Sequence, residues 1–304
     1  MPVPTREELR LGILYIIAAV FVFAVINALV KYEEETWPVI DVLFFRCVFA
    51  LIFSLGLVAR HGGIAMLKTN RPLEHLGRSA LQFISMTSIY IAFHLMPLAD
   101  AVAITFSNPL FLTVLSIPVL GEKVGRHRWG AVIVGFIGVL IMVQPGAGVF
   151  SLAALLALVN ASVGASVTIA LRRMSLTEHA VTLCTYQALG TTVLSTLLLP
   201  FGWVTPTWQG MIGLAAIGLA SGLGQFLWTQ AFRLAPAAVL APFNYTTMIW
   251  AIGFGYFMWG EMPTSMVLLG TAVVVGSGLY ILYRETVRRA VQPATLAAAS
   301  SGSS

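Results

Sequence analysis

The chain has 304 residues, of which 58% are hydrophobic and only 10% are charged, whereas a soluble domain carries about 25% charged residues. This composition excludes an ordinary water-soluble fold and indicates a chain that is surrounded by lipid. The net charge of +5 does not indicate a nucleic-acid-binding protein, because the basic residues stand in short hinges between apolar runs.

Apolar runs of about 20 residues, the length that crosses a bilayer, recur along the whole chain. The first run is too long for a signal peptide and is interpreted as a retained helix. None of the runs alternates with a period of two, so we predict an all-α integral membrane protein. The ten predicted spans are 11–30, 39–59, 76–95, 100–120, 128–144, 151–171, 180–199, 210–231, 238–259 and 266–283.

The positions of the basic residues support this number of spans. Of the 17 lysine and arginine residues, all except Lys31 and Arg46 fall at the set of helix ends that also holds both termini. Basic residues favour the cytoplasmic side of a membrane. We therefore predict that the protein lies in a bacterial inner membrane with both termini in the cytoplasm.

The two halves of the sequence resemble each other at a shift of 139 residues. The five-helix unit that repeats has an odd number of helices, so the copies cross the membrane in opposite directions. Such inverted repeats are typical of transporters. We predict repeats at 11–145 and 150–284, a cytoplasmic segment at 1–10 and a disordered tail at 285–304. The matching pairs are Phe93 and Phe232, Leu95 and Leu234, Pro97 and Pro236, and Gly121-Glu122 and Gly260-Glu261.

The stretch 99–139 resembles the core signature of the EamA branch of the drug/metabolite transporter superfamily. A second copy at 231–278 departs from it by having Met248 where the first has Pro109, with Pro242 one and a half turns earlier. The resemblance implies ten helices, two repeats and export of small metabolites. Within this branch the chain most resembles YddG-type exporters of aromatic and other amino acids. The matching elements are Ala99, Ala101, Ala103, Pro109, Leu120-Gly121-Glu122, Trp129-Gly130-Ala131, Gly135 and Gly138-Val139.

Helix-breaking residues inside the spans are candidate hinges. Pro109 and Pro242 remove a backbone donor from their helices, and Gly222 and Gly224 loosen the eighth span. These residues are expected to bend helices that open and close the two mouths. For the two glycines, the ordinary abundance of glycine in membrane helices is an equally good explanation.

Polar side chains within spans are costly beside lipid and tend to face a cavity. Most serines and threonines can bond their own backbone, whereas amides and large polar aromatics cannot be hidden so cheaply. An amide and aromatic lining suits an amphipathic zwitterion. The residues predicted to line the path are Tyr90, Asn108, Asn160, Gln225, Trp228, Asn244 and Tyr245.

The distribution of charge within the spans favours transport without proton coupling. No aspartate or glutamate lies near the middle of a span, although proton-driven antiporters usually need one there. His94 can titrate but stands at a helix end. Arg46 can snorkel to the interface, pair with Asp41 or attract a carboxylate, and the structural role is preferred. The acidic segment 33–35 is interpreted as a solvated turn.

The leading hypothesis is therefore an exporter of small amphipathic metabolites, above all amino acids including aromatic ones, that works by alternating access. The alternative transporter is a proton-coupled efflux pump for cationic drugs. A membrane-embedded enzyme is disfavoured, because no nucleophile–base pair or metal-ligand cluster is visible. We expect lipids and a small-molecule substrate as partners, no nucleic acid, no cofactor, no metal and a monomeric state.

Overall fold

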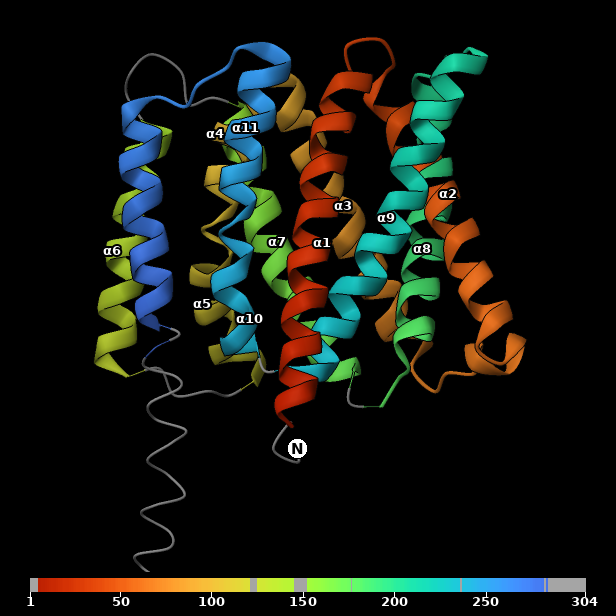
Figure 1. Ribbon diagram of the computed structural model, residues 1–304, viewed down its shortest axis with the longest axis horizontal. Helices are drawn as coiled ribbons and strands as arrows, with labels where there is room; N and C mark the ends of the chain where they lie inside the picture. Colours follow the sequence, from red (N-terminus) through yellow and green to blue (C-terminus); the bar gives the residue numbers. More distant parts are fainter. Residues whose placement is uncertain are drawn as a thin grey trace, which may run out of the picture.

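The computed structural model describes residues 5–120, 125–144, 152–175, 177–235, 237–281 and 283, and within these ranges all regular structure is helical. The helices stand side by side with their long axes roughly parallel (Figure 1). They are α1 (Arg6–Glu33), α2 (Val39–Arg60), α3 (Pro72–Leu95), α4 (Leu98–Thr105), α5 (Asn108–Leu120), α6 (Arg126–Val143), α7 (Leu152–Met174), α8 (Ala180–Thr196), α9 (Trp208–Leu234), α10 (Ala237–Asn244), α11 (Thr247–Trp259) and a last helix, Ser265–Ile281. Two short 3₁₀ turns, Gly63–Leu67 and Leu199–Phe201, follow α2 and α8.

Six helical segments in the described part are long and apolar enough to cross a membrane. The outer surface of the bundle exposes large apolar side chains such as Leu14, Ile133 and Phe257, which are 63%, 58% and 84% exposed. A water-soluble protein rarely exposes so much continuous apolar surface. The chain is therefore a multi-pass membrane protein. The six segments are Arg6–Glu33, Val39–Arg60, Leu98–Leu115, Leu152–Met174, Ala180–Phe201 and Trp208–Leu234.

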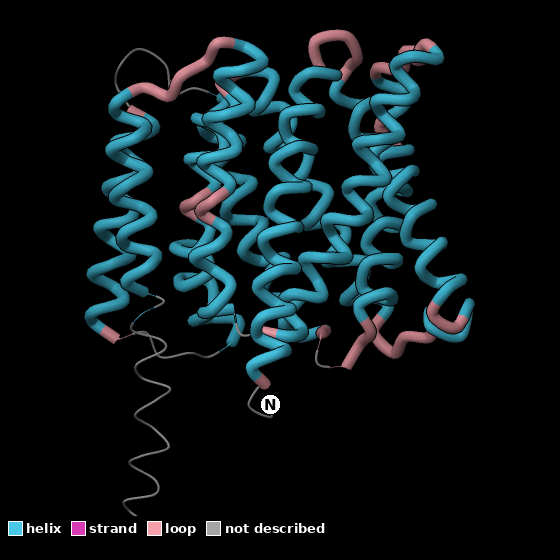
Figure 2. Tube along the Cα trace, in the orientation of Figure 1, coloured by secondary structure: helices cyan, strands magenta, loops and turns pink. Residues whose placement is uncertain are grey.

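Two of the predicted spans are each built from a pair of half-helices. The span predicted at 100–120 is interrupted between α4 and α5, at Phe106 and Ser107, and the span predicted at 238–259 between α10 and α11, at Tyr245 and Thr246. Figure 2 shows both interruptions at mid-height and next to each other. A shift of 139 residues carries the bounds of α4 and α5 onto those of α10 and α11.

The two interruptions share one local feature, and the first has a proline in addition. In the first copy the hydroxyl of Ser107 donates to the carbonyl of Ile104 at 2.7 Å. In the first copy, Pro109 supplies no backbone N–H to the start of α5. In the second copy Met248 takes this place, yet the helix still breaks. There the hydroxyls of Thr246 and Thr247 each donate to the carbonyl three residues earlier, at 2.7 Å. Such local bonds compete with the helical hydrogen-bond ladder.

The packing of the helices repeats as well. Helix α1 packs along α9 as α7 packs along α3, and α2 packs on α9 as α8 packs on α3. The half-helices α4 and α5 lie on α7, whereas α10 and α11 lie on α1. In Figure 1, α1 begins and the last helix ends at the same face of the molecule. The matching helix–helix contacts of the two halves are those expected of two structural copies in opposite orientations.

Close contact between helices explains some of the glycines in α6 and in the last helix. Helix α6 meets the last helix at Gly138 and Gly270, where an added Cβ would lie 2.9 Å and 2.6 Å from the carbonyl oxygen of the other glycine. Gly278 likewise leaves room for the hydroxyl of Tyr245. An added Cβ at Gly130 or Gly276 meets no described atom within 4 Å.

Candidate substrate cavity

A central cavity of about 340 Å³, partly open to the surroundings, lies between the two halves of the molecule. Its walls come from both halves, including α1, α3, α4, α7, α8, α9 and α11. Thr105, the last residue of α4, and Thr247, the first residue of α11, both line it. Each broken helix therefore presents its break to the cavity.

Arg78 supplies the charge of this cavity. It lies in the second turn of α3 and is only 2% exposed. One terminal nitrogen donates to the carboxamide oxygen of Gln187 and the other to the backbone carbonyl of Leu183, while Nε has no acceptor among the described residues. No salt bridge to an acidic side chain is present in the described part of the chain. The arginine is thus held in place by neutral groups alone.

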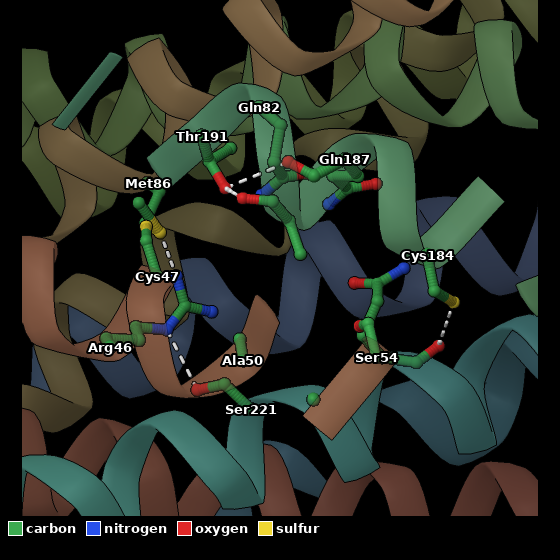
Figure 3. A pocket seen from close by; sticks show the side chains of 13 residues that line it. Arg46, Cys47, Ala50, Ser54, Gln82, Met86, Cys184, Gln187, Thr191 and Ser221 are labelled. Carbon is green, nitrogen blue, oxygen red and sulfur yellow. Dashed lines mark hydrogen bonds between the residues drawn. The ribbon is translucent and has the colours of Figure 1, made fainter. Parts of the chain in front are cut away.

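A smaller side cavity, of about 50 Å³, adjoins the central one. Gln82, Gln187 and Gln225, from α3, α8 and α9, line both cavities. Figure 3 shows the side cavity, with Arg46 at its edge. The three glutamines form the boundary between the two spaces, and we call them the glutamine layer.

Arg46 is fixed by contacts to three other helical residues. Its Nε donates to Ser221 Oγ at 2.9 Å, Nη1 contacts the sulfur of Met86, and the guanidinium carbon lies 5.3 Å from the ring centroid of Tyr90. The alternative pairing with Asp41 is not formed, and Asp41 accepts from the backbone N–H of Val204 at 3.1 Å. Arg46 lines a cavity rather than the lipid boundary.

One end of the bundle is closed by a charged cluster that joins the two halves. Lys31, at the end of α1, bonds both carboxylate oxygens of Glu261 at 2.8 Å and the carbonyl of Met96 at 3.3 Å. Glu261 also accepts from the backbone N–H of Leu98 at 3.2 Å. We call these four residues the latch. It ties the first half to the turn that follows α11.

Glu34 lies beside the latch. The prediction that the acidic segment 33–35 is a solvated turn is wrong for this residue. Its side chain is buried, with the residue only 4% exposed, and neither carboxylate oxygen has a partner among the described residues. Burial raises the pKa of this carboxyl to about 9, against the opposing effect of Lys31. Glu34 is therefore protonated at neutral pH, whereas Glu35 remains exposed.

Three of the seven predicted lining residues reach the central cavity: Asn160, Gln225 and Trp228. The amide of Asn160 donates to the carbonyl and the hydroxyl of Ser85 at 2.8 Å and 2.9 Å, which joins α7 to α3. Trp228 lies edge-on to Phe23, with 6.0 Å between the ring centroids. These contacts hold the polar and aromatic walls in place.

The other four predicted residues lie away from the cavity wall. Asn108 donates to the carbonyl of Ala161 at 2.9 Å and so joins α5 to α7. Tyr90 is buried against Arg46, and Tyr245 packs edge-on to Phe106. Asn244 has a buried carboxamide oxygen with no partner among the described residues. Their place on the transport path stays a prediction.

The predicted hinge and charge residues are placed as follows. Pro109 is the second residue of α5, directly after the first break, and Pro242 lies inside α10, three residues before the second. Helix α9 runs unbroken through Gly222 and Gly224, where added Cβ atoms would meet Phe53 and Phe23. His94 is exposed near the end of α3. Hinge motion at these four proline and glycine positions stays a prediction.

Comparison with known proteins identifies the class of the molecule. The EamA-like transporter family matches the chain twice, over residues 10–144 and 151–283. The chain belongs to this family. Both matches together cover most of the sequence, and each covers one of the two structural copies. This EamA protein is therefore a transporter and not an enzyme.

Its relatives carry different small metabolites. An S-adenosylmethionine uptake transporter of Rickettsia bellii is 31% identical over 255 residues, which is 84% of this chain and 87% of the relative. The pseudopaline exporter CntI of Pseudomonas aeruginosa is 29% identical over 88% of this chain and 95% of its own. A riboflavin transporter of Rhizobium johnstonii is 27% identical over 93% of this chain and 94% of its own. A solved crystal structure shares the fold, with a TM-score of 0.65 and 16% sequence identity. The match covers 91% of this chain and 98% of the chain in that structure.

The sequence analysis of this EamA transporter assigned Arg78 to the wrong place. Arg78 was counted with the basic residues at the cytoplasmic helix ends, although it falls inside the predicted span 76–95. Helix α3 starts at Pro72, so six residues place Arg78 roughly 9 Å along the helix axis. Its position inside an apolar run was the available signal. Gln82 and Gln187 also lie within predicted spans, but nothing in the sequence distinguished them from Gln230.

Proposed function

We propose that this EamA transporter exports amphipathic zwitterionic metabolites, namely amino acids, including aromatic ones, and compounds that carry an amino-acid head group. The observation that carries the proposal is the buried Arg78 in the central cavity, with a free Nε donor and no acidic partner among the described residues. A buried charge without a counter-charge is costly. A substrate carboxylate relieves that cost and binds the planar guanidinium fork well.

The rest of the cavity suits the other parts of such a substrate. Asn27, Gln82 and Thr105 offer amide and hydroxyl oxygens to an ammonium group. Phe93 and Trp228 offer apolar and aromatic surface to a side chain. A mostly apolar pocket with a few convergent polar groups is the usual form of a small-molecule site.

One relative carries a substrate of this class, the riboflavin transporter carries one outside it, and the relatives do not fix the direction of transport. S-adenosylmethionine carries an α-amino carboxylate, which matches the head group proposed for Arg78. One relative is an uptake transporter and another is an exporter. Export is proposed here from the sequence resemblance to YddG-type exporters.

We infer alternating access across ten spans, with both termini in the cytoplasm. The inverted repeat supports two related states around one central site. The latch holds together the end of the bundle opposite the N-terminus, which the distribution of basic residues makes the external end. Opening that end requires Lys31 and Glu261 to separate, and the breaks in the two half-helix pairs supply flexible points for the movement.

Transport without proton coupling is favoured by the lining of both cavities, which includes no acidic side chain among the described residues. The alternative, a proton-coupled efflux pump for cations, would depend on Glu34. That carboxyl is buried beside the latch and has a raised pKa, so it can gain and lose a proton when the latch opens.

The test is uptake of labelled amino acids into proteoliposomes that contain the purified protein, with and without a pH gradient. Wild type is compared with Arg78→Gln and with a control, Arg60→Gln, at the exposed end of α2. We expect saturable uptake that Arg78→Gln lowers by about tenfold or more and Arg60→Gln leaves intact. Uptake of organic cations but of no amino acid would favour the alternative, and gradient-driven accumulation would overturn the uncoupled mechanism.

A further inference from the structure

The side cavity has its own cationic group, which the central site does not use. Arg46 carries five N–H donors, and the structure shows two of its nitrogens in contact with acceptors, the hydroxyl of Ser221 and the sulfur of Met86. A thioether sulfur is only a weak acceptor. Among the described residues no acidic side chain lines the side cavity. Figure 3 shows the guanidinium beside Met86 and Ser221 within the ring of lining residues.

Arg46 also lies within the span and lines a cavity there. It stands seven residues after the start of α2 at Val39, which is roughly 10 Å along the helix axis. The face of the Tyr90 ring stabilises the cation from one side but supplies no negative charge. The remaining donors are therefore available to an anion that enters the side cavity.

We propose that the side cavity is a second anion-binding subsite, so that the preferred substrate carries an acidic group at each end. This inference rests on the proposed function, because it takes the first carboxylate to bind Arg78. The glutamine layer connects the two subsites. Gln187 accepts from Arg78 through its carboxamide oxygen, which leaves its amide N–H groups as donors at the boundary with the side cavity.

Helix α3 connects the two cationic groups. Arg78 stands on it and Arg46 contacts Met86 eight residues later, so the backbone positions of Arg78 and Met86 are roughly 12 Å apart along the helix axis. The matching substrate class is a dicarboxylate, with or without an amino group, that is long enough to reach both guanidinium groups at once.

The experiment measures how unlabelled acids compete with the uptake of a labelled amino acid into proteoliposomes. The competitors are succinate, adipate, suberate and sebacate, each paired with the monocarboxylate of the same chain length. We expect the advantage of the dicarboxylate over its monocarboxylate partner to be greatest at one chain length. At the best length the dicarboxylate should inhibit about tenfold more strongly than its monocarboxylate partner, the value of one added charge-assisted contact. Equal inhibition by both members of every pair would overturn the subsite.

Variants assign the effect to Arg46. In Arg46→Gln the ratio of dicarboxylate to monocarboxylate inhibition should fall to about one, whereas the exposed control Arg60→Gln should keep the wild-type ratio. The melting temperature of each variant in detergent shows whether it is folded, and Arg46→Lys, which keeps the charge, replaces the glutamine variant if that one does not fold. In the lysine variant the ratio should persist at a lower value, and its complete loss would count against the subsite.

The two proposals fail in different ways. If labelled amino acids are not transported at all, both the proposed function and the subsite are overturned. If amino acids are transported and Arg78→Gln abolishes their uptake, but Arg46→Gln keeps the wild-type ratio, the subsite alone is overturned.

Discussion

The two halves of the chain have the same backbone plan but different chemistry. The first half supplies Arg46, Arg78 and Lys31 to the cavities and the latch, whereas the second half supplies Gln187 and Gln225. Helix α8 contains no basic residue, and the one in α9 stands in its last turn. The repeat therefore sets the positions of the helices, and unrelated substitutions in each copy set the site. A symmetric fold can close at either end while its pocket binds an asymmetric solute.

The largest effect is expected from removing the charge of Arg78, which the first half supplies to the central cavity. Arg78→Gln should weaken substrate binding by about tenfold or more, because it removes the partner of a buried carboxylate. Gln225→Ala, in the second half, should weaken it by only about threefold to tenfold, the value of one neutral hydrogen bond. Equilibrium binding of a labelled amino acid to the purified variants measures both. Equal losses would mean that the two halves contribute alike.

The latch tests whether the halves separate at the end that it closes. Lys31→Met should leave the carboxylate of Glu261 without its partner, which costs less than the roughly 3–5 kcal/mol of a fully buried pair because the Glu261 side chain is 25% exposed. We expect the end of the bundle that the latch joins to open more often in this variant. A cysteine introduced at Asn27, in a protein whose Cys47 and Cys184 are replaced by serine, should then react several-fold faster with a membrane-impermeant thiol reagent.

The double variant Lys31→Met with Glu261→Gln is the control for the latch. Because the two residues form one contact, its effect should be smaller than the sum of the two single effects. Additive effects would show that the pair does not act as a unit.

The two half-helix breaks allow a smaller test. Pro109→Ala restores a backbone donor to α5, whereas the second break has no proline at the matching position. The alanine variant should transport several-fold more slowly, because a straighter helix bends less readily. Met248→Ala, the matched change in the second copy, should have little effect on the transport rate. A slower Met248→Ala and an unaffected Pro109→Ala would reverse the assignment.

The smallest effect is expected at Glu34, as a dependence of stability on pH. Its pKa is about 9 in the folded protein and 4.5 in the unfolded chain. Between these values the folded state holds the proton and the unfolded state does not, so the carboxyl lowers stability as the pH rises. Glu34→Gln should leave the melting temperature in detergent unchanged at pH 4 and raise it at pH 9, where the unfolded state has released its proton. An equal shift at both pH values would contradict the assignment.

Much of the architecture was predictable from the sequence because it follows from length, composition and internal similarity. The pairing of Phe93 with Phe232 and of Leu95 with Leu234 already placed the two copies in register, and the bounds of α4, α5, α10 and α11 follow the same shift. The break beside Pro109 has a local cause that a reader of the sequence can see. The break at Tyr245 has no proline at the matching position, and the hydroxyl-to-carbonyl bonds found there occur at both breaks.

The site was harder to predict. Asn160, Gln225 and Trp228 were expected on the cavity wall and lie there, but so do Arg78 and Gln187, which were not selected. In a soluble helix the apolar stripe points to the core, so the pattern tells which face is inside. A membrane helix is apolar toward the lipid and toward its neighbours alike. The face that meets the cavity therefore leaves little trace in the sequence.

The sequence by itself determined that this chain is a helical membrane protein of two related halves and that it belongs to a transporter family, because hydrophobic length and internal repetition are properties of the chain alone. The tertiary structure decided which side chains meet. It turned Arg78 inward, buried Glu34, joined Lys31 to Glu261 and placed three glutamines between two cavities. These contacts link residues up to 230 positions apart, and their geometry depends on how helices rotate and cross rather than on any local pattern.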